Sequence, residues 1–258
     1  MTMNVFSHSG DLGDLIYALP VIEMLGGGKL CLIRADCGIQ TPFIPSTVES
    51  LKPLLEAQSY IMSIEYIDTK TAIGVDLDKW RKYVSMYDRA HYNLVEMQAI
   101  TVGLHYSHKC AWLKINNPNK IAKVVIARSL SHHNPTYKSL LTEIYHKYSK
   151  SAIFVGYRSE YDAWCVEFGS EIDYYPTSTI WELSRVISGA EIFIGNSSLP
   201  LAIAVGLYTP TIIHEPIPVP IWMYRTFEPD PIPVYLYRTI FHRPGFYYNT
   251  GDICVAIS

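Results

Sequence analysis

Two aspartates stand in a short turn near the start of the chain, in the stretch HSGDLGDLIYALP at 8–20. Asp11 and Asp14 each follow a glycine, and the apolar residues MNVF precede the stretch. A strand-to-helix turn that holds phosphate uses backbone N–H groups and positive charge, which carboxylates oppose. The acids therefore either favour the start of a helix electrostatically, or one of them takes a proton from a substrate.

A second candidate site is GNSSLP at 195–200, which follows the apolar residues EIFI. Free backbone N–H groups and the helix dipole at such a turn can hold a diphosphate. Asparagine, serine and an early proline are also ordinary residues of a helix N-terminus, so a purely structural role is equally open. The candidate diphosphate-binding residues here are Gly195, Asn196, Ser197 and Ser198.

Three further strand ends carry residues that could contact a nucleotide. Arg128, with Ser129 beside it, could bind a phosphate through two parallel hydrogen bonds. Gly156 would let the backbone approach a ligand, and Tyr157 could lie against a base. Glu215 could accept hydrogen bonds from both hydroxyls of a ribose. Each also has an ordinary structural interpretation, as a solvated strand end or part of a surface loop.

The composition restricts the classes of protein to consider. The 258 residues are 49% hydrophobic and 17% charged, which suits one large domain or two of about 120 residues each. A net charge of −3 argues against a strongly basic nucleic-acid or membrane-binding protein. Five cysteines without a C-x-x-C pair indicate a reducing compartment, and we see no signal peptide or membrane span. We therefore expect a soluble, cytoplasmic protein.

Short apolar runs alternate with segments of helical periodicity along both halves of the chain. We expect strands at 3–7, 29–33, 60–67, 122–127, 152–155, 191–194 and 211–214, and helices at 14–25, 47–57, 93–104, 136–148, 160–168, 179–188 and 199–207. Proline-rich residues 215–233 are expected to form loops, and INNPNK at 115–120 is the expected domain boundary. This order predicts an α/β protein with two Rossmann-like domains whose parallel sheets face a central cleft.

Two motifs resemble those of heptosyltransferase-like glycosyltransferases. SGDLGDLIYALP resembles the N-terminal motif, in which Gly-Asp opens the first helix and Leu-Pro follows within it. WELSRVISGAEIFIGNSSLPLAIAVGLYTPTI at 181–212 resembles the C-terminal signature, with Gly-Asn-x-Ser-x-Pro between a strand and a small-residue helix. The resemblance implies a GT-B architecture, with an acceptor domain at 1–117, a nucleotide-sugar domain at 118–235 and a segment at 236–258 that returns to the first domain.

The resemblance also implies roles for single residues. Asp14 falls at the position of the family's catalytic base, which would take the proton of an acceptor hydroxyl as that hydroxyl attacks the anomeric carbon. One such displacement inverts the configuration of the sugar. Asp11 would assist or cap the helix, Gly13 would lie on the donor side, and Arg128 with the turn at 195–198 would neutralise the leaving diphosphate. A nucleotide-diphosphate sugar is then the co-substrate, and because no D-x-D site is found, no metal or other cofactor is expected.

The sequence departs from the family pattern at several positions. The family usually has an acid after the asparagine and a histidine after the proline, where this chain has Ser197 and Ala202. The identity of the donated sugar, heptose included, is therefore not carried over. A lysine expected early in the second half is not evident, and Arg128 and Lys138 are the candidates to replace it.

The acceptor and the reaction class have alternatives. A saccharide or lipid-linked glycan is the default acceptor, while hydroxymethylated bases of DNA would use the basic, aromatic stretches at 79–92 and 238–248. The stretch DKWRKYVSMYDRAHY at 78–92 is more simply an amphipathic helix with a solvated face. A non-catalytic nucleotide-sugar-binding homologue, or an epimerase or phosphorylase on similar domains, completes the set of alternatives.

Overall fold

Each half of the chain forms its own parallel sheet, and the division between the first and the second unit falls between Asn116 and Asn117 in the sequence. The structure, a computed structural model, describes residues 3–34, 43–82, 94–106, 111–130, 142, 145–169, 172–209, 211–213 and 234–236. For the last two ranges only the backbone is described. The predicted α/β class, with a Rossmann-like parallel sheet in each half, is confirmed.

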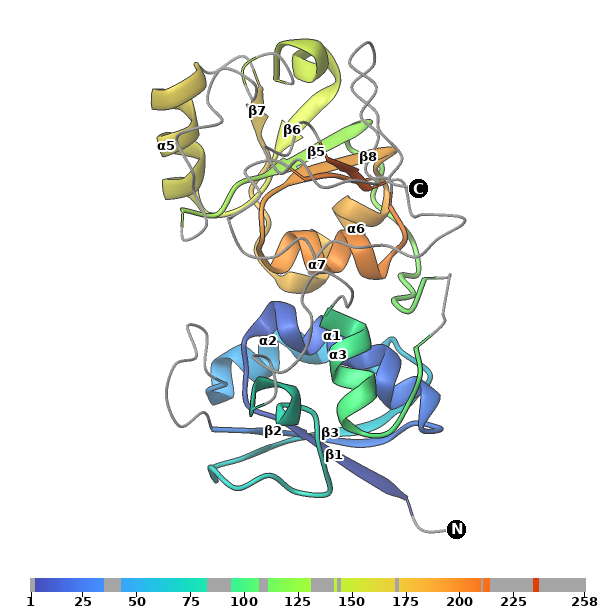
Figure 1. Ribbon diagram of the computed structural model, residues 1–258. Coiled ribbons are helices and arrows are strands. Elements are labelled where there is room, and N and C mark those ends of the chain that lie inside the picture. The colour runs from blue at the N-terminus through green and yellow to red at the C-terminus, as the bar shows by residue number, and fades with distance from the viewer. Residues whose placement is uncertain are drawn as a thin grey trace. The chain divides into compact units, whose positions relative to one another are not determined.

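The first unit contains a four-stranded parallel sheet in the order β3-β2-β1-β4. Its strands are β1 (Asn4–His8), β2 (Gly28–Ile33), β3 (Ile61–Ile67) and β4 (Val75–Asp76), and its helical segments are α1 (Leu12–Met24), α2 (Pro45–Glu56), the 3-10 helix η1 (Lys79–Lys82) and α3 (Leu94–Thr101). The chain moves from β1 to β2 to β3 in one direction, and right-handed crossovers then place α1 and α2 on the same face. Figure 1 shows α1, α2 and α3 together on one side of this sheet.

Helix α1 is apolar on every side from Leu15 to Ile22, and all eight of these residues are buried. Leu15, Ile16, Leu19 and Ile22 are fully buried. The helix ends at a glycine run in which Gly27 has φ +76°, and a Cβ there would come within 2.5 Å of the Tyr60 carbonyl oxygen. Glycine is therefore required where α1 turns into β2.

Pro20 lies inside α1 and lacks the N–H that would bond to the Ile16 carbonyl oxygen. The indole of Trp112 supplies the missing donor, because its Nε1 lies 3.0 Å from that oxygen. Trp112 is itself buried, and its own carbonyl oxygen accepts a hydrogen bond from the Tyr60 hydroxyl at 2.7 Å. Asp14, the candidate base, thus lies on a helix in which a residue far along the chain supplies the hydrogen bond that Pro20 cannot make.

Replacing Trp112 with phenylalanine should lower the free energy of unfolding by about 1–3 kcal/mol through the lost hydrogen bond, in addition to the loss of packed volume. Trp164→Phe is the matched control, since Trp164 is equally buried and its indole nitrogen has no hydrogen-bond partner among the described residues. Urea unfolding of the three proteins measures the difference. Equal losses for both variants would show that the Trp112 hydrogen bond contributes nothing.

The second unit contains a six-stranded parallel sheet in the order β10-β9-β8-β5-β6-β7. Its strands are β5 (Val124–Ala127), β6 (Ala152–Phe154), β7 (Asp173–Tyr174), β8 (Ile192–Gly195), β9 (Thr211–Ile213) and β10 (Val234–Leu236), and its helical segments are the 3-10 helix η4 (Ser149–Ser151), α5 (Arg158–Phe168), α6 (Ile180–Ser188) and α7 (Leu199–Gly206). The chain runs outward through β5, β6 and β7 and then returns to β8, which places α5 opposite α6 and α7 (Figure 1).

The expected elements are mostly present, with shifted ends. The short strands β4, β7 and β10 were not expected, and α5 begins at Arg158, two residues before the predicted start. Three predicted segments lie outside the described residues: most of the helix expected at 136–148, the stretch 83–92, and all but the first residue of the C-terminal segment at 236–258.

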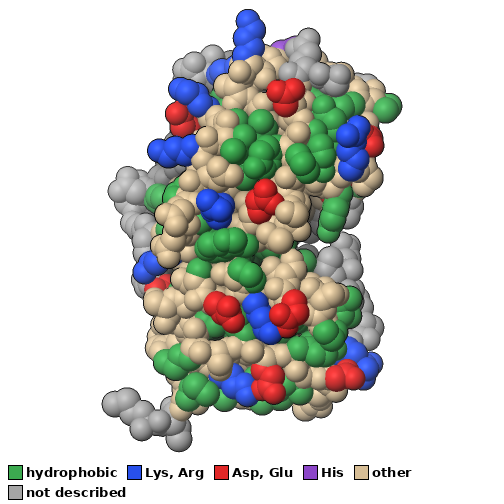
Figure 2. All heavy atoms as spheres, turned by 180° about the vertical axis from the view of Figure 1, so that it is seen from behind, with side chains coloured by type: hydrophobic (Ala, Val, Ile, Leu, Met, Phe, Trp, Pro, Cys, Tyr) green, Lys and Arg blue, Asp and Glu red, His purple; other side chains and the backbone are tan. Residues whose placement is uncertain are grey.

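The surface carries opposite charges close together. On the face shown in Figure 2, Lys and Arg side chains are interspersed with Asp and Glu. Independently of that view, the structure contains the ion pairs Lys29–Glu65, Arg34–Asp68, Lys52–Glu49, Lys123–Glu191 and Arg158–Asp162. Within the part of the chain that the structure describes, no helix is both long and apolar enough to cross a bilayer.

Candidate active site

Strand order locates one ligand-binding edge in each unit. In parallel α/β sheets, ligands bind beyond the carboxyl ends of two neighbouring strands from which the chain departs in opposite directions. In the first unit these strands are β1 and β4, since β1 lies between β2 and β4. In the second unit they are β5 and β8. The motif containing Asp11 and Asp14 follows β1, and GNSSLP follows β8.

The turn after β1 is shaped by His8. The Gly10 N–H donates to His8 Nδ1 at 3.1 Å, and the ring lies edge-on to Phe43 with centroids 6.0 Å apart. Burial lowers the pKa of His8, so the imidazole is neutral at pH 7 and carries its proton on Nε2. His8 therefore acts as a fixed hydrogen-bond acceptor that holds the turn in place.

Asp14 lies in the first turn of α1, where its side chain is 18% exposed. Arg81 donates from Nη2 to Asp14 Oδ2 at 2.5 Å. Burial raises the pKa of Asp14 to about 6, against the opposing effect of Arg81. The carboxylate is thus ionised at neutral pH, yet it is a stronger base than an ordinary aspartate, as a general base requires.

Arg81 and Asp78 were not recognised from the sequence, although both lie in the stretch 78–92. Arg81 donates from Nε to Asp78 Oδ1 at 3.1 Å and from Nη2 to the Gly10 carbonyl at 2.5 Å. Asp78 Oδ2 accepts from the Ser9 N–H at 2.6 Å and from the Ser9 hydroxyl at 2.8 Å. Burial alone would raise the pKa of Asp78, but the hydrogen bonds from Ser9 and the charge of Arg81 lower it.

The described part of that stretch is therefore a 3-10 helix at Lys79–Lys82 whose arginine reaches the active-site candidate. The amphipathic α-helix expected there is not formed over these four residues. The sequence did contain a signal for Asp78, namely the acidic residues of VDLD at 75–78 after a short apolar run. In an α/β chain, acidic residues at the end of a strand place carboxylates at the carboxyl edge of the sheet.

Asp11 and Gly13 flank the start of α1. Asp11 occupies the N-cap position but makes no capping hydrogen bond through its side chain, while its carbonyl accepts from the Leu15 N–H at 3.0 Å. Gly13 is the second residue of the helix, directly before Asp14. Both lie beside Asp14 in the chain, and their roles in catalysis and donor binding stay predictions.

In the second unit, Asn196 connects the ends of β5 and β8. Its Oδ1 accepts from the Ser129 N–H at 2.9 Å, and its Nδ2 donates to the Ser129 carbonyl at 2.8 Å. Asn196 is fully buried. The structure thus brings the predicted residues Ser129 and Asn196 together. The Asn196 side chain holds the loop after β5 and is not exposed to solvent.

The two serines of GNSSLP lie at the start of α7. Ser198 is the N-cap residue, and its hydroxyl donates to the Asn196 carbonyl at 3.0 Å. Ser197 is 4% exposed, and its hydroxyl has no hydrogen-bond partner among the described residues. Because the first turn of a helix also leaves N–H groups without helical partners, this turn offers several donors to an anion. Gly195 closes β8, where a Cβ would clash with the ring of Phe193.

The Arg128 side chain is buried in an ion pair of the second unit. Its guanidinium is 1% exposed, its Nη1 is 2.9 Å from Glu167 Oε2, and its Cζ lies 5.1 Å from the Phe168 ring centroid. The cause is strand alternation: Arg128 lies two residues beyond Ile126, which packs in the core with Trp164 of α5. The structure therefore supports a buried ion pair for Arg128, and contact with a diphosphate stays a prediction that needs a different side-chain position.

Gly156 and Tyr157 follow β6. Gly156 has φ +133°, and a Cβ there would come within 2.6 Å of Glu160 Oε2, which accepts from the Tyr157 N–H at 2.8 Å. The glycine is thus explained by the capping of α5. The Tyr157 side chain is 77% exposed, which leaves its ring open to a ligand. Glu215 and Lys138 lie outside the described residues.

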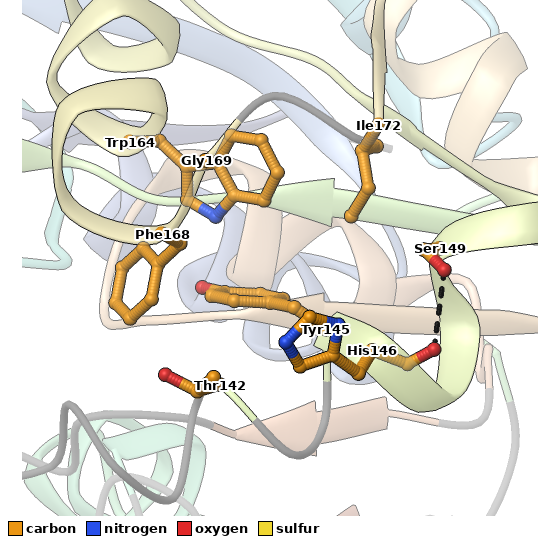
Figure 3. A pocket seen from close by; sticks show the side chains of 8 residues that line it. All are labelled: Thr142, Tyr145, His146, Ser149, Trp164, Phe168, Gly169 and Ile172. Atoms are coloured by element: carbon orange, nitrogen blue, oxygen red, sulfur yellow. Dashed lines mark hydrogen bonds between the residues drawn. The ribbon is translucent and has the colours of Figure 1, made fainter.

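A small pocket lies elsewhere in the second unit, at the C-terminal end of α5 (Figure 3). It has room for about one water molecule, so it cannot hold a nucleotide. Its lining residues are Thr142, Tyr145, His146, Ser149, Trp164, Phe168, Gly169 and Ile172. Over the described ranges, no three His, Cys, Asp or Glu side chains are grouped to hold a metal ion.

Asp14→Asn is expected to change stability in a pH-dependent manner. The folded-state pKa of about 6 lies above the ordinary aspartate pKa of 3.8, so Asp14 destabilises the fold as pH rises through this window. The advantage of the asparagine variant in unfolding free energy should grow by about 2 kcal/mol from about pH 4.5 to about pH 7.5. Urea unfolding at the two pH values measures it. Asp68→Asn, at an exposed position, should show no such trend, and a flat difference for Asp14→Asn would contradict the raised pKa.

Comparison with known proteins gives matches in structure only. No family model matches the sequence, and no curated protein matches it. E. coli heptosyltransferase WaaC with ADP-2-deoxy-2-fluoro heptose superimposes with a TM-score of 0.52 at 10% identity, covering 82% of this chain and 88% of that chain. E. coli ADP-heptose LPS heptosyltransferase II gives a TM-score of 0.50 at 10% identity, with 82% and 84% covered.

A third solved structure is larger than this chain. The iron-containing dodecameric glycosyltransferase TibC from enterotoxigenic E. coli gives a TM-score of 0.51 at 14% identity, covering 83% of this chain and 59% of that chain. Likenesses at such identity are evidence about the fold. The chain therefore shares the GT-B-like fold of these glycosyltransferases.

Proposed function

We propose that the chain is an inverting glycosyltransferase that moves a sugar from a nucleotide-diphosphate sugar to an acceptor hydroxyl. The observation that carries this proposal is Asp14, a nearly buried carboxylate with a pKa raised to about 6 at the ligand-binding edge of the first sheet. The fold shared with glycosyltransferases supports the reaction class.

The first unit would bind the acceptor and activate it. Asp14 takes the proton of the acceptor hydroxyl while the oxygen attacks the anomeric carbon and the bond to the diphosphate breaks. A single displacement from the opposite side inverts the anomeric configuration. A saccharide is the first acceptor to test, since one fold relative is named an ADP-heptose LPS heptosyltransferase.

The second unit would hold the donor at the edge formed by β5 and β8. The N–H groups at the start of α7 can bind the diphosphate and stabilise its charge as it leaves. The Ser197 hydroxyl is buried, so it would have to turn outward to join them. The exposed ring of Tyr157 can lie against the base. Because the WaaC structure carries an ADP-linked sugar, ADP and ADP-sugars are the first donors to test.

The test is thermal unfolding of the purified full chain with a panel of nucleotides and nucleotide-sugars. A ligand at about 100 times its Kd adds about 2.7 kcal/mol of stability, which is a measurable shift for a protein of this size. A shift with one base and one sugar would identify the donor, and transfer to added saccharides would follow by product analysis. No shift with any nucleotide would contradict the proposal, whereas donor binding without transfer to any acceptor would support a non-catalytic binding protein instead.

A further inference from the structure

Arg81 contacts three groups that belong to three different segments. It binds Asp14 Oδ2 in α1, Asp78 Oδ1 before η1 and the Gly10 carbonyl in the turn after β1. Its Cζ also lies 4.9 Å from the ring centroid of Trp80, which is buried. A guanidinium held at four points has little freedom, so it fixes the position of whatever carboxylate it binds.

The hydrogen bond from Arg81 engages only one of the two Asp14 oxygens. Among the described residues, Arg81 is the donor to the Asp14 carboxylate, and it binds Oδ2. Asp14 Oδ1 is then the oxygen that can accept a proton from a substrate hydroxyl. The backbone of Asp14 is fixed as well, because Gln98 Nε2 donates to its carbonyl at 3.1 Å.

Asp78 in turn holds Arg81 and the turn together. One of its oxygens accepts from Arg81, while the other accepts from both the backbone N–H and the hydroxyl of Ser9. The Asp78 side chain is 15% exposed, so these charge-assisted hydrogen bonds are only partly weakened by solvent. The chain of contacts therefore runs from the β1 turn through Asp78 and Arg81 to the reacting carboxylate.

We propose that Arg81, anchored by Asp78, is a positioning residue that holds Asp14 Oδ2 and directs Asp14 Oδ1 toward the acceptor hydroxyl. This inference rests on the proposed function. Arg81 acts through Asp14 and does not itself exchange a proton with the substrate.

The same contact sets the pH at which Asp14 ionises. Burial raises the pKa of Asp14, Arg81 lowers it by its charge and hydrogen bond, and Asp11 and Asp78 raise it. The neighbouring His8 is neutral, and Asp76 lies on the adjacent strand β4. Removing the positive charge of Arg81 should therefore raise the pKa of Asp14 further above 6, so that less carboxylate is present at neutral pH.

The test compares Arg81→Met, Arg81→Lys and the control Lys82→Met in the full chain. Lys82 is an exposed cation on the same 3-10 helix, so its removal changes the net charge equally without touching Asp14. The titration of the Asp14 carboxyl carbon is followed by NMR, assigned through Asp14→Asn. Arg81→Met should raise the Asp14 pKa by about one unit or more, and Lys82→Met should leave it unchanged.

Arg81→Lys separates charge from geometry. A lysine keeps the charge but has a single nitrogen in place of the rigid fork whose Nε reaches Asp78 and whose Nη2 reaches Asp14. The Asp14 pKa should therefore stay near the wild-type value, while kcat falls and KM for the donor is unchanged. Equal Asp14 titration in Arg81→Met and Lys82→Met, or full kcat in Arg81→Lys, would overturn the positioning role. If Arg81→Met shifts the titration but the wild type transfers no sugar, the contact stands and the proposed function fails.

Discussion

Replacing Asp14 with asparagine is expected to lower the rate of sugar transfer by about 10²–10⁴-fold, the range typical for loss of a general base. Asparagine keeps the size of the side chain but cannot accept the acceptor's proton. Donor affinity should be unchanged, since the candidate diphosphate-binding turn lies in the second unit. Initial rates of transfer and donor-induced thermal shifts, measured on the same preparation, separate the two effects.

Asp68→Asn is the matched control for this experiment. Asp68 is an exposed aspartate of the first unit that pairs with Arg34, far along the chain from α1. The control should keep both transfer and donor binding. An Asp14→Asn protein that folds, binds donor and still transfers sugar at the wild-type rate would exclude Asp14 as the base and would leave the glycosyltransferase fold without its proposed chemistry.

Replacing Asn196 with alanine is expected to have the second largest effect, on the donor site. The change removes two hydrogen bonds to the Ser129 backbone and releases the loop after β5 from the loop after β8. The lost contacts should lower the free energy of unfolding by about 1–3 kcal/mol. Because the same loop positions Ser197 and the start of α7, we also expect donor affinity to fall by at least about tenfold, which is about 1.4 kcal/mol.

Asn4→Ala distinguishes the local effect from general destabilisation. Asn4 Nδ2 also donates to a backbone carbonyl, that of Leu25 at 2.7 Å, but it lies at the amino end of β1 in the first unit. This variant should lose stability and retain donor affinity in titration calorimetry. If Asn196→Ala bound the donor as tightly as Asn4→Ala, the turn after β8 would be a helix cap and not a diphosphate site.

The sequence predicted the sheets because local pattern and final structure agree there. Buried strands such as β5 and β8 appear in the sequence as short apolar runs. Helices α1 and α6 have apolar residues at helical spacing and are followed by glycine. Ser129 and Asn196 lie together because they follow two neighbouring parallel strands, whose carboxyl ends meet at one edge of the sheet.

Contacts between distant residues could not be predicted in the same manner. The Arg81–Asp14 ion pair joins residues 67 positions apart, and its arginine belongs to a stretch whose composition suggests a solvated face. The position of Arg128 depends on the face of the sheet toward which its side chain points. That face is identified only once α5 is packed there and Glu167 pairs with Arg128. The compensation of Pro20 by Trp112 likewise has no local signal.

The most direct test of Asp14 as the general base uses water as the acceptor, since water is the smallest hydroxyl compound that Asp14 could deprotonate. The donor identified by thermal shift is incubated with the wild-type protein alone from about pH 4.5 to about pH 8.5, and NMR records the rate and the anomer first released. The role of Asp14 as the base predicts a rate that rises to a plateau with a midpoint at a pH of about 6, and release of the inverted anomer. A rate independent of pH across this range, or release of the retained anomer, would contradict it.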